Sequence, residues 1–171
     1  MTVQCKFESL EALRAVVGSE AFVSDWILID QRRINLFAEA TDDPQWIHID
    51  TERAARESPF GGTIAHGFLT LSLLGRFYDQ HLTLPFCAMG INYGLNRVRF
   101  TCPVRAGQRV RGRFLLSRLD EIEGGIQMAF VVTIEIEGEN KPACIAESLV
   151  RQYFPDRKST RLNSSHVSES R

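Results

Sequence analysis

The last third of the chain alternates apolar and less apolar residues. From Ile126 to Ile136 the even positions are all apolar, whereas the odd positions include Gln127, Thr133 and Glu135. This two-residue period is typical of a strand that buries one face. The same alternation recurs, less regularly, in 96–102, 108–119 and 142–154. Turn signals at Gly124-Gly125 and 138–142 separate the last three segments, which therefore predict an antiparallel meander.

The first third has shorter, mostly helical patterns. A helix is predicted within 7–18, capped by Ser9 and ended by Gly18, and a strand is predicted across 21–30. A second helix is predicted over 31–43, because Pro44 disfavours helical dihedral angles at Asp43. A third short helix over 51–58 follows Asp50, whose carboxylate can cap it. These helices are expected at the periphery of the domain.

The segment 63–82 is a longer helix with apolar side chains around most of its circumference. Such a helix must be buried on most sides. A buried helix followed by antiparallel strands predicts an α+β fold in which the sheet curls around a long central helix.

Length and composition favour one domain. The chain has 171 residues, of which 44% are hydrophobic, enough for one core. We assign residues 1–155 to this domain. The Ser-rich end, 156–171, has no apolar periodicity and is predicted to be a disordered or non-native tail.

Charge and cysteine usage exclude several partner classes. The 20 Lys and Arg residues are balanced by 21 Asp and Glu, so no general attraction to nucleic acid is expected. No apolar stretch approaches the ~20 residues of a membrane span, and no secretory leader is evident. The four cysteines are far apart, without metal-ligand spacing. A cytoplasmic protein with reduced thiols is predicted.

The stretch "FAEATDDPQWIHID", residues 37–50, places Asp43 five positions before His48. On an ideal helix these side chains would point about 140° apart, but Pro44 breaks the helix and lets a turn bring them together. A carboxylate and a neutral imidazole around one water form an acid/base pair suited to adding or removing water across a carbon–carbon double bond. The alternative is structural: Asp43 caps a short turn and His48 is a surface polar residue.

Gly67 is predicted near the first turn of the long helix. A first-turn N–H has no partner within the helix and lies at its positive end, so Gly67 can donate to a thioester carbonyl oxygen. Equally, the missing side chain would let the helix approach a strand closely. His66 either lines the site or has a structural role.

Other candidates are less specific. Tyr93 and Asn96 would wall a tunnel, or lie at a bulge near Gly94. Of the arginines in 97–113, some, such as Arg99, could contact substrate phosphates, although alternation makes most of them a solvated face. His48 and Asp50 form an H-x-D pair that, with His66 or His81, would give an iron ligand set; both added histidines lie on the apolar helix rather than on strands, so we expect no metal.

These motifs together resemble the MaoC-like dehydratases, (R)-specific enoyl-CoA hydratases of the hotdog fold, and in particular the single-hotdog, NodN-like subgroup. The resemblance rests on 37–50, on "PFGGTIAHGFLTLSLL" (59–74) and on "INYGLNRVRF" (91–100). It extends from Phe7 to about Tyr153.

The family's motif has the form D-x-x-x-[apolar]-H-x-[DE], matched here by Asp43, Ile47, His48 and Asp50. The resemblance implies that Asp43 and His48 activate a water, that the Gly67 N–H polarises the thioester carbonyl, and that Asp50 is structural. Where the family often has Gly-Asp this chain has Asp42-Asp43, and two buried carboxylates there would make the pH optimum atypical.

The resemblance also implies a substrate, an assembly and a reaction. The substrate would be a trans-2-enoyl thioester of coenzyme A, hydrated without cofactor in a homodimer. From the residues themselves, we predict Trp46, His66, Tyr93, Asn96 and Arg99 as substrate-binding residues. A hotdog thioesterase and a non-catalytic acyl-thioester binding module are the alternatives.

Overall fold

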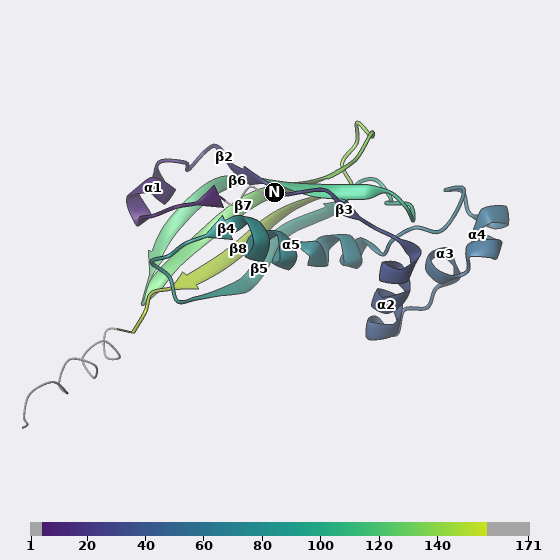
Figure 1. Ribbon diagram of the computed structural model, residues 1–171, viewed down its shortest axis with the longest axis horizontal. Coiled ribbons are helices and arrows are strands. Elements are labelled where there is room, and N and C mark those ends of the chain that lie inside the picture. Colours follow the sequence, from purple (N-terminus) through teal and green to yellow (C-terminus); the bar gives the residue numbers. More distant parts are fainter. Residues whose placement is uncertain (1–4, 157–171) are drawn as a thin grey trace, which may run out of the picture.

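The computed structural model describes residues 5–156 (Figure 1). Apart from Asp156, the predicted tail 156–171 lies outside the described residues. The elements, in chain order, are β1 (Cys5–Lys6), α1 (Leu10–Arg14), β2 (Glu20–Val23), β3 (Ile27–Leu28), α2 (Gln31–Thr41), α3 (Trp46–Ile49), α4 (Thr51–Glu57), α5 (Gly67–His81), β4 (Leu82–Thr83), β5 (Met89–Phe100), β6 (Arg109–Ile122), β7 (Gly125–Ile136) and β8 (Cys144–Tyr153).

The main sheet is antiparallel and has the strand order β2-β6-β7-β8-β5, with β3 also paired to β6. Strands β6, β7 and β8 are hydrogen-bonded in sequence, which confirms the predicted meander. Strand β5 pairs only with β8 among the described strands, so its other edge is open. The short β1 and β4 form a separate parallel pair.

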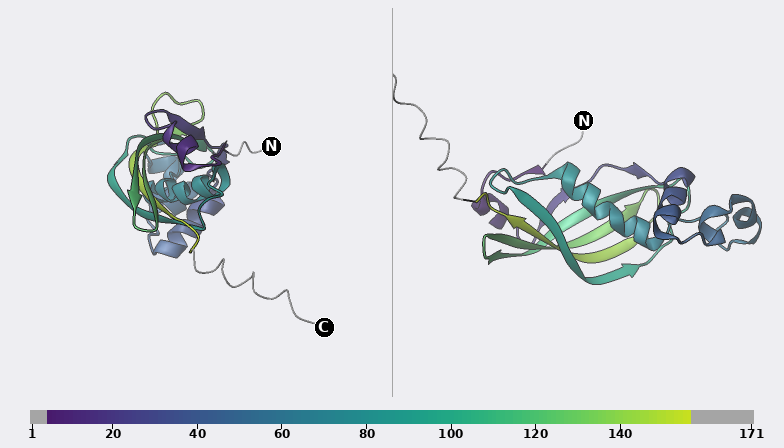
Figure 2. Two further views of the ribbon diagram at one scale, coloured as in Figure 1. Left: turned by 90° about the vertical axis from the view of Figure 1, so that its left-hand side faces the viewer. Right: turned by 90° about the horizontal axis from the view of Figure 1, so that it is seen from below.

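Helix α5 lies along the concave side of the curved sheet (Figure 2), and this confirms the α+β prediction of a sheet curled around a long helix. Its buried residues include Leu69, Leu73 and Phe77, which meet Phe114 of β6 and other side chains in one core. Burying such a side chain contributes about 1.5–3 kcal/mol. The N-terminal end of α5 faces the short helices α2 to α4, which lie beyond the end of the sheet (Figures 1 and 2).

The burial of α5 is incomplete. Phe68 is 69% exposed and Leu71 and Gly75 are half-buried, so one face of the helix is uncovered. This face continues onto β5, because the Phe68 and Phe100 rings lie edge to face with their centroids 5.7 Å apart. Helix α5 and strand β5 thus share one exposed apolar surface.

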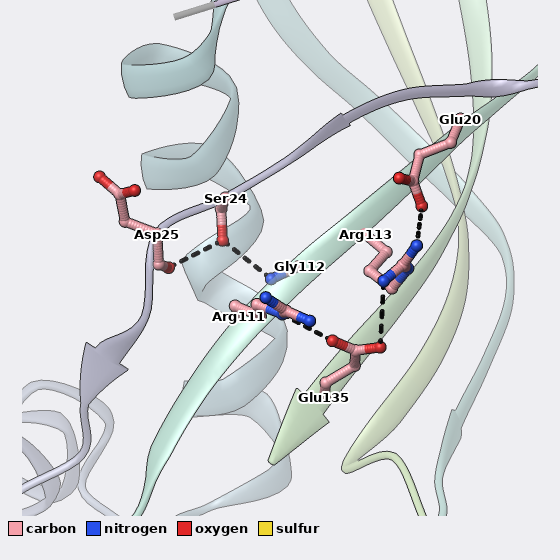
Figure 3. A network of polar contacts seen from close by, with 7 residues as sticks. All are labelled: Glu20, Ser24, Asp25, Arg111, Gly112, Arg113 and Glu135. Carbon is pink, nitrogen blue, oxygen red and sulfur yellow. Dashed lines mark hydrogen bonds and ion pairs between the residues drawn. The ribbon is translucent and has the colours of Figure 1, made fainter. Parts of the chain in front are cut away.

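The predicted strand over 21–30 is wrong in one respect: it is broken into β2 and β3. The Ser24 N–H still donates to the Gly112 carbonyl at 2.8 Å, and the Ser24 hydroxyl accepts from the Gly112 N–H at 2.9 Å (Figure 3). The Asp25 N–H, however, donates to Nε2 of the buried His81 at 3.2 Å. The Asp25 N–H is thus used outside the sheet, and β3 pairs with β6 again from Ile27.

Several arginines of β6 form ion pairs with the neighbouring strands. Arg111 contacts Glu135 of β7 at 2.7 Å, and Arg113 contacts Glu20 of β2 at 2.6 Å (Figure 3). Arg109 is paired with Glu137 at 3.3 Å. All these side chains are at least partly exposed, as the solvated-face interpretation predicts, and such pairs each contribute only about 0–1 kcal/mol.

Two predicted helix caps are confirmed: Ser9 caps α1, and Asp50 caps α4 by accepting from the Arg53 N–H at 2.9 Å. Asp30 caps α2, where no cap was predicted. The short helix α3 was not predicted, because the sequence indicated only a turn after Pro44. None of the helices within residues 5–156 combines the length and the apolar composition that crossing a membrane requires.

Candidate active site

The end of α2 places Asp43. Asp42 adopts a left-handed conformation, with φ 52°, and both its N–H and that of Asp43 return to the Ala38 carbonyl. This left-handed cap reverses the chain, and Pro44 prevents the helix from resuming at once. The Asp43 side chain, 56% exposed, therefore lies at the junction between α2 and α3.

His48 is fixed from α3 by main-chain groups. Its Nδ1 lies 2.7 Å from the Ile64 carbonyl oxygen, and the Ile64 N–H donates to the Ile47 carbonyl at 3.0 Å. The Gln31 side chain, at the start of α2, donates to the His48 carbonyl at 2.7 Å. These bonds join α2, α3 and the segment before α5 around one imidazole.

The hydrogen bond to Ile64 sets the tautomer of His48. A carbonyl oxygen only accepts, so Nδ1 carries the proton and Nε2 has a free lone pair. Burial lowers the pKa of His48 below its usual range, since the charged ring would lose its hydration, and the nearby His66 adds to the decrease. The Ile64 carbonyl and Asp43 oppose this shift without cancelling it. A neutral imidazole with a bare nitrogen is the form that a general base requires.

His66 packs directly on His48. The two rings are stacked with centroids 3.7 Å apart, and Phe37 of α2 contacts His66 from another direction with centroids 5.1 Å apart. Nε2 of His66 lies 3.0 Å from the Asp43 carbonyl oxygen and 3.8 Å from an Asp43 carboxylate oxygen. The side chain is only 4% exposed, so the predicted acid/base pair is accompanied by a second, buried histidine.

A pocket of about 300 Å³ lies beside this cluster and is lined by residues that include His48, Gly67, Thr70, Phe100 and Cys102. Gly67 is the first residue of α5, and His66 makes no side-chain cap for that helix. The Gly67 N–H is therefore one of the donors that the helix itself leaves unused. His48 and Gly67 thus line the same space, as the acid/base hypothesis requires.

The packing role of Gly67 is also present. A Cβ at this position would lie 2.9 Å from atoms of the Phe100 ring, closer than carbon atoms approach in proteins. The absence of a side chain lets the start of α5 rest on the end of β5. The donor and packing interpretations of Gly67 are therefore compatible.

Asp43, His48 and His66 offer donor atoms that lie within 4.8 Å of one another. We assign no metal to them, because the two rings are stacked with an interplanar angle of 26°, and lone pairs in two such nearly parallel planes are poorly placed to meet at one ion. The H-x-D alternative fails on geometry: Asp50 caps α4, and His81 lies at the far end of α5 beside Asp25.

These observations define one pocket lined by His48 and by the first residue of α5. His66 and the Asp43 carboxylate lie next to His48 but are not among the lining residues. A family model described as "MaoC like domain" matches residues 14–137. The chain belongs to the MaoC-like domain family.

Relatives of this MaoC-like chain extend over nearly its whole fold. It is 51% identical over 146 residues to "3-hydroxyacyl-thioester dehydratase Z" of Mycobacterium tuberculosis, covering 85% of this chain and 96% of the relative. It is 52% identical over 157 residues to "Nodulation protein N" of Rhizobium meliloti, with 86% and 93% covered. Family membership in the MaoC-like dehydratases thus rests on sequence.

A solved structure supports the fold. The (R)-hydratase from A. caviae involved in PHA biosynthesis superposes with a TM-score of 0.62 at 23% identity, covering 81% of this chain and 96% of that one. This similarity confirms the hotdog fold that the sequence motifs predicted.

None of the predicted substrate-binding residues of the MaoC-like chain, His66 included, lines the 300 Å³ pocket. The guanidinium carbon of Arg53 lies 4.3 Å from the centroid of the Trp46 ring, and that of Arg151 lies 3.3 Å from the centroid of the Tyr93 ring. Asn96 donates to Glu147 at 2.8 Å, and Arg99 donates to the Val98 carbonyl at 2.8 Å. Tyr93 and Asn96 are the extra residues at two bulges of β5, close to the bulge predicted at Gly94. Their contact with substrate stays a prediction.

Two features of the site were not expected from the sequence. The Ile64 carbonyl and the Gln31 amide hold His48, and neither residue type indicates such a role. The atypical pH optimum expected from the sequence also requires the Asp42 and Asp43 carboxylates to be buried. Both residues are exposed.

Proposed function

We propose that this MaoC-like protein is a hydro-lyase that reversibly hydrates a trans-2-enoyl-CoA to the (R)-3-hydroxyacyl-CoA. The observation that carries the proposal is the buried His48, held neutral with its Nδ1–H on the Ile64 carbonyl, beside Asp43 and in one pocket with Gly67. The family and the relative named 3-hydroxyacyl-thioester dehydratase support the reaction class.

In the hydration direction, Asp43 and His48 Nε2 hold one water molecule between them. As the water oxygen bonds to the β-carbon, these two groups remove its proton and supply a proton to the α-carbon. Negative charge develops meanwhile on the thioester oxygen, and the Gly67 N–H stabilises it at the positive end of α5. No step needs a metal or an organic cofactor. Dehydration is the reverse of this path.

The other residues proposed to bind substrate lie outside the pocket. Trp46, Tyr93, Asn96 and Arg99 are assigned to the coenzyme A and acyl portions beyond the pocket. We also propose that the protein acts in the cytoplasm. The similarity to a nodulation protein leaves the pathway undefined.

We further propose a homodimer formed through β5 and the uncovered face of α5. The open edge of β5 carries large apolar side chains that are 39–55% exposed: Met89, Ile91, Tyr93, Leu95 and Phe100. A long exposed edge strand with such side chains invites pairing with another strand. A second copy related by a two-fold axis presents the same edge.

The function is tested by incubating the purified protein with trans-2-enoyl-CoA of short and medium chain length. Loss of the enoyl absorbance, formation of the (R)-3-hydroxyacyl product and release of free thiol are followed in parallel. The hydratase predicts the first two without the third. Thiol release would instead identify a thioesterase, and tight binding without turnover would identify a binding module.

A further inference from the structure

His66 is a buried polar side chain whose two ring nitrogens have different environments. Nε2 lies 3.0 Å from the Asp43 carbonyl oxygen, whereas Nδ1 is buried without a hydrogen-bond partner. An unsatisfied buried nitrogen lowers stability, and most folds avoid it. Because the unpaired Nδ1 lowers stability, the presence of a buried histidine at this position calls for a functional explanation.

The neighbouring carbonyl groups give the two stacked histidines opposite tautomers. The Asp43 carbonyl only accepts, so His66 carries its proton on Nε2. For His48 the same reasoning with Ile64 places the proton on Nδ1. The two rings are stacked in this arrangement, with their centroids 3.7 Å apart.

The bond from His66 joins segments that are distant in sequence. His66 precedes α5, whereas Asp43 lies in the turn after α2. The Asp43 N–H donates to the Ala38 carbonyl at 3.0 Å, so Asp43 is also bonded to α2. The stack on His48 ties the same ring to α3. His66 thus contacts both members of the acid/base pair: Asp43 through a hydrogen bond and His48 through the ring stack.

We propose that His66 is a positioning residue, whose Nε2–H holds the Asp43 main chain against the His48 ring so that both side chains keep the spacing that one water molecule requires. This inference rests on the proposed hydratase function and deepens it. It gives His66 a role through Asp43 and His48 rather than through the substrate.

Two replacements of His66 separate positioning from packing. His66→Phe keeps a ring between Phe37 and His48 but removes the donor and the unsatisfied Nδ1. We expect kcat to fall roughly 10- to 100-fold, because small misplacements of reacting groups have effects of that order, with KM nearly unchanged. The Tm should stay equal or rise by about 2–4 °C, because the buried unsatisfied nitrogen is gone. His66→Gln retains an Nε2 donor and should recover most of kcat.

Opposite changes in activity and stability would distinguish positioning from a packing role. If His66→Phe keeps full kcat, or if His66→Gln is as impaired as His66→Phe at equal Tm, the proposal is wrong. Histidine ¹⁵N spectra of the wild type provide a test that needs no turnover. They should show His66 protonated at Nε2 and His48 at Nδ1, and the Asp43 amide resonance should move in His66→Phe but much less in His66→Gln.

These spectra also separate the two proposals. A protein that hydrates no enoyl thioester but shows the opposite tautomers and the Asp43 shift would overturn the hydratase function and keep the positioning geometry. A proton on Nδ1 of His66, or an unmoved Asp43 resonance, would overturn the positioning role whatever the activity.

Discussion

At the scale of single residues, the left-handed Asp42 is a local source of strain. Its φ of 52° is a conformation in which glycine has no penalty and other residues do. We predict that Asp42→Gly raises the free energy of unfolding by about 0.5–1 kcal/mol. Asp42→Ala, which keeps a Cβ and loses the polar side chain, should lower it. Urea denaturation of the three proteins compares them, and equal stabilities would contradict this view of the α2 cap.

The lowered pKa of His48 predicts a pH effect on stability. Because the folded ring binds a proton less readily than the unfolded one, whose pKa is about 6.5, the unfolded chain takes up more protons as the pH falls below that value. The contribution of His48 to the free energy of unfolding is therefore fully present above pH ~6.5 and is lost in more acidic solution. Urea denaturation between pH 7.5 and 5 should show a smaller decrease for His48→Gln than for the wild type. An identical decrease would mean that His48 is not the group concerned.

At the scale of elements, Gly67 is the contact between α5 and β5. A methyl group there would meet the Phe100 ring, so Gly67→Ala should lower the free energy of unfolding by about 1–3 kcal/mol. Gly75→Ala is the matched control on the same helix, because its Cβ would meet only the Asn92 side chain, at an ordinary 3.7 Å. Gly67→Ala combined with Phe100→Leu should recover part of the loss.

The recovery in the double variant is the decisive comparison, measured by thermal unfolding. The N–H of residue 67 is retained throughout, so hydration activity should return together with stability. If Gly67→Ala is as stable as Gly75→Ala, the packing role of Gly67 is refuted.

Elements with a strong sequence period were predictable, whereas those set by distant partners were not. The alternation in 126–136 and the apolar pattern in 63–82 indicated β7 and α5, because each period reflects one buried face or an enclosed helix. At the break between β2 and β3, the Asp25 N–H donates to Nε2 of His81, a residue 56 positions away in the sequence. No local pattern reports such a bond.

The same distinction holds within the candidate site. Asp43, His48 and Gly67 could be predicted because their side-chain chemistry and a family motif point to them. The Ile64 carbonyl could not, since every residue has such a group and only the fold selects one. The place of His66 beneath the pair likewise depends on how α5 meets α2.

At the scale of the whole molecule, the exposed edge of β5 predicts a dimer. Light scattering coupled to size exclusion should give twice the 19.4 kDa chain mass. The double replacement Ile91→Lys and Leu95→Lys should shift the mass toward the monomer, since like charges would meet across the two-fold axis. Leu28→Lys, on β3 and 48% exposed, should leave the dimer intact. A monomeric wild type at tens of micromolar would contradict the proposed interface.

The addition of water to an enoyl thioester by Asp43 and His48 can be measured directly. The hydration rate of trans-2-enoyl-CoA is compared for the wild type, Asp43→Asn, and Asp42→Asn, which alters the adjacent exposed carboxylate. We expect Asp43→Asn to lose activity about 10²- to 10⁴-fold, the usual contribution of acid–base catalysis, and Asp42→Asn to keep it. Full activity in Asp43→Asn, or an equal loss in Asp42→Asn, would contradict this expectation.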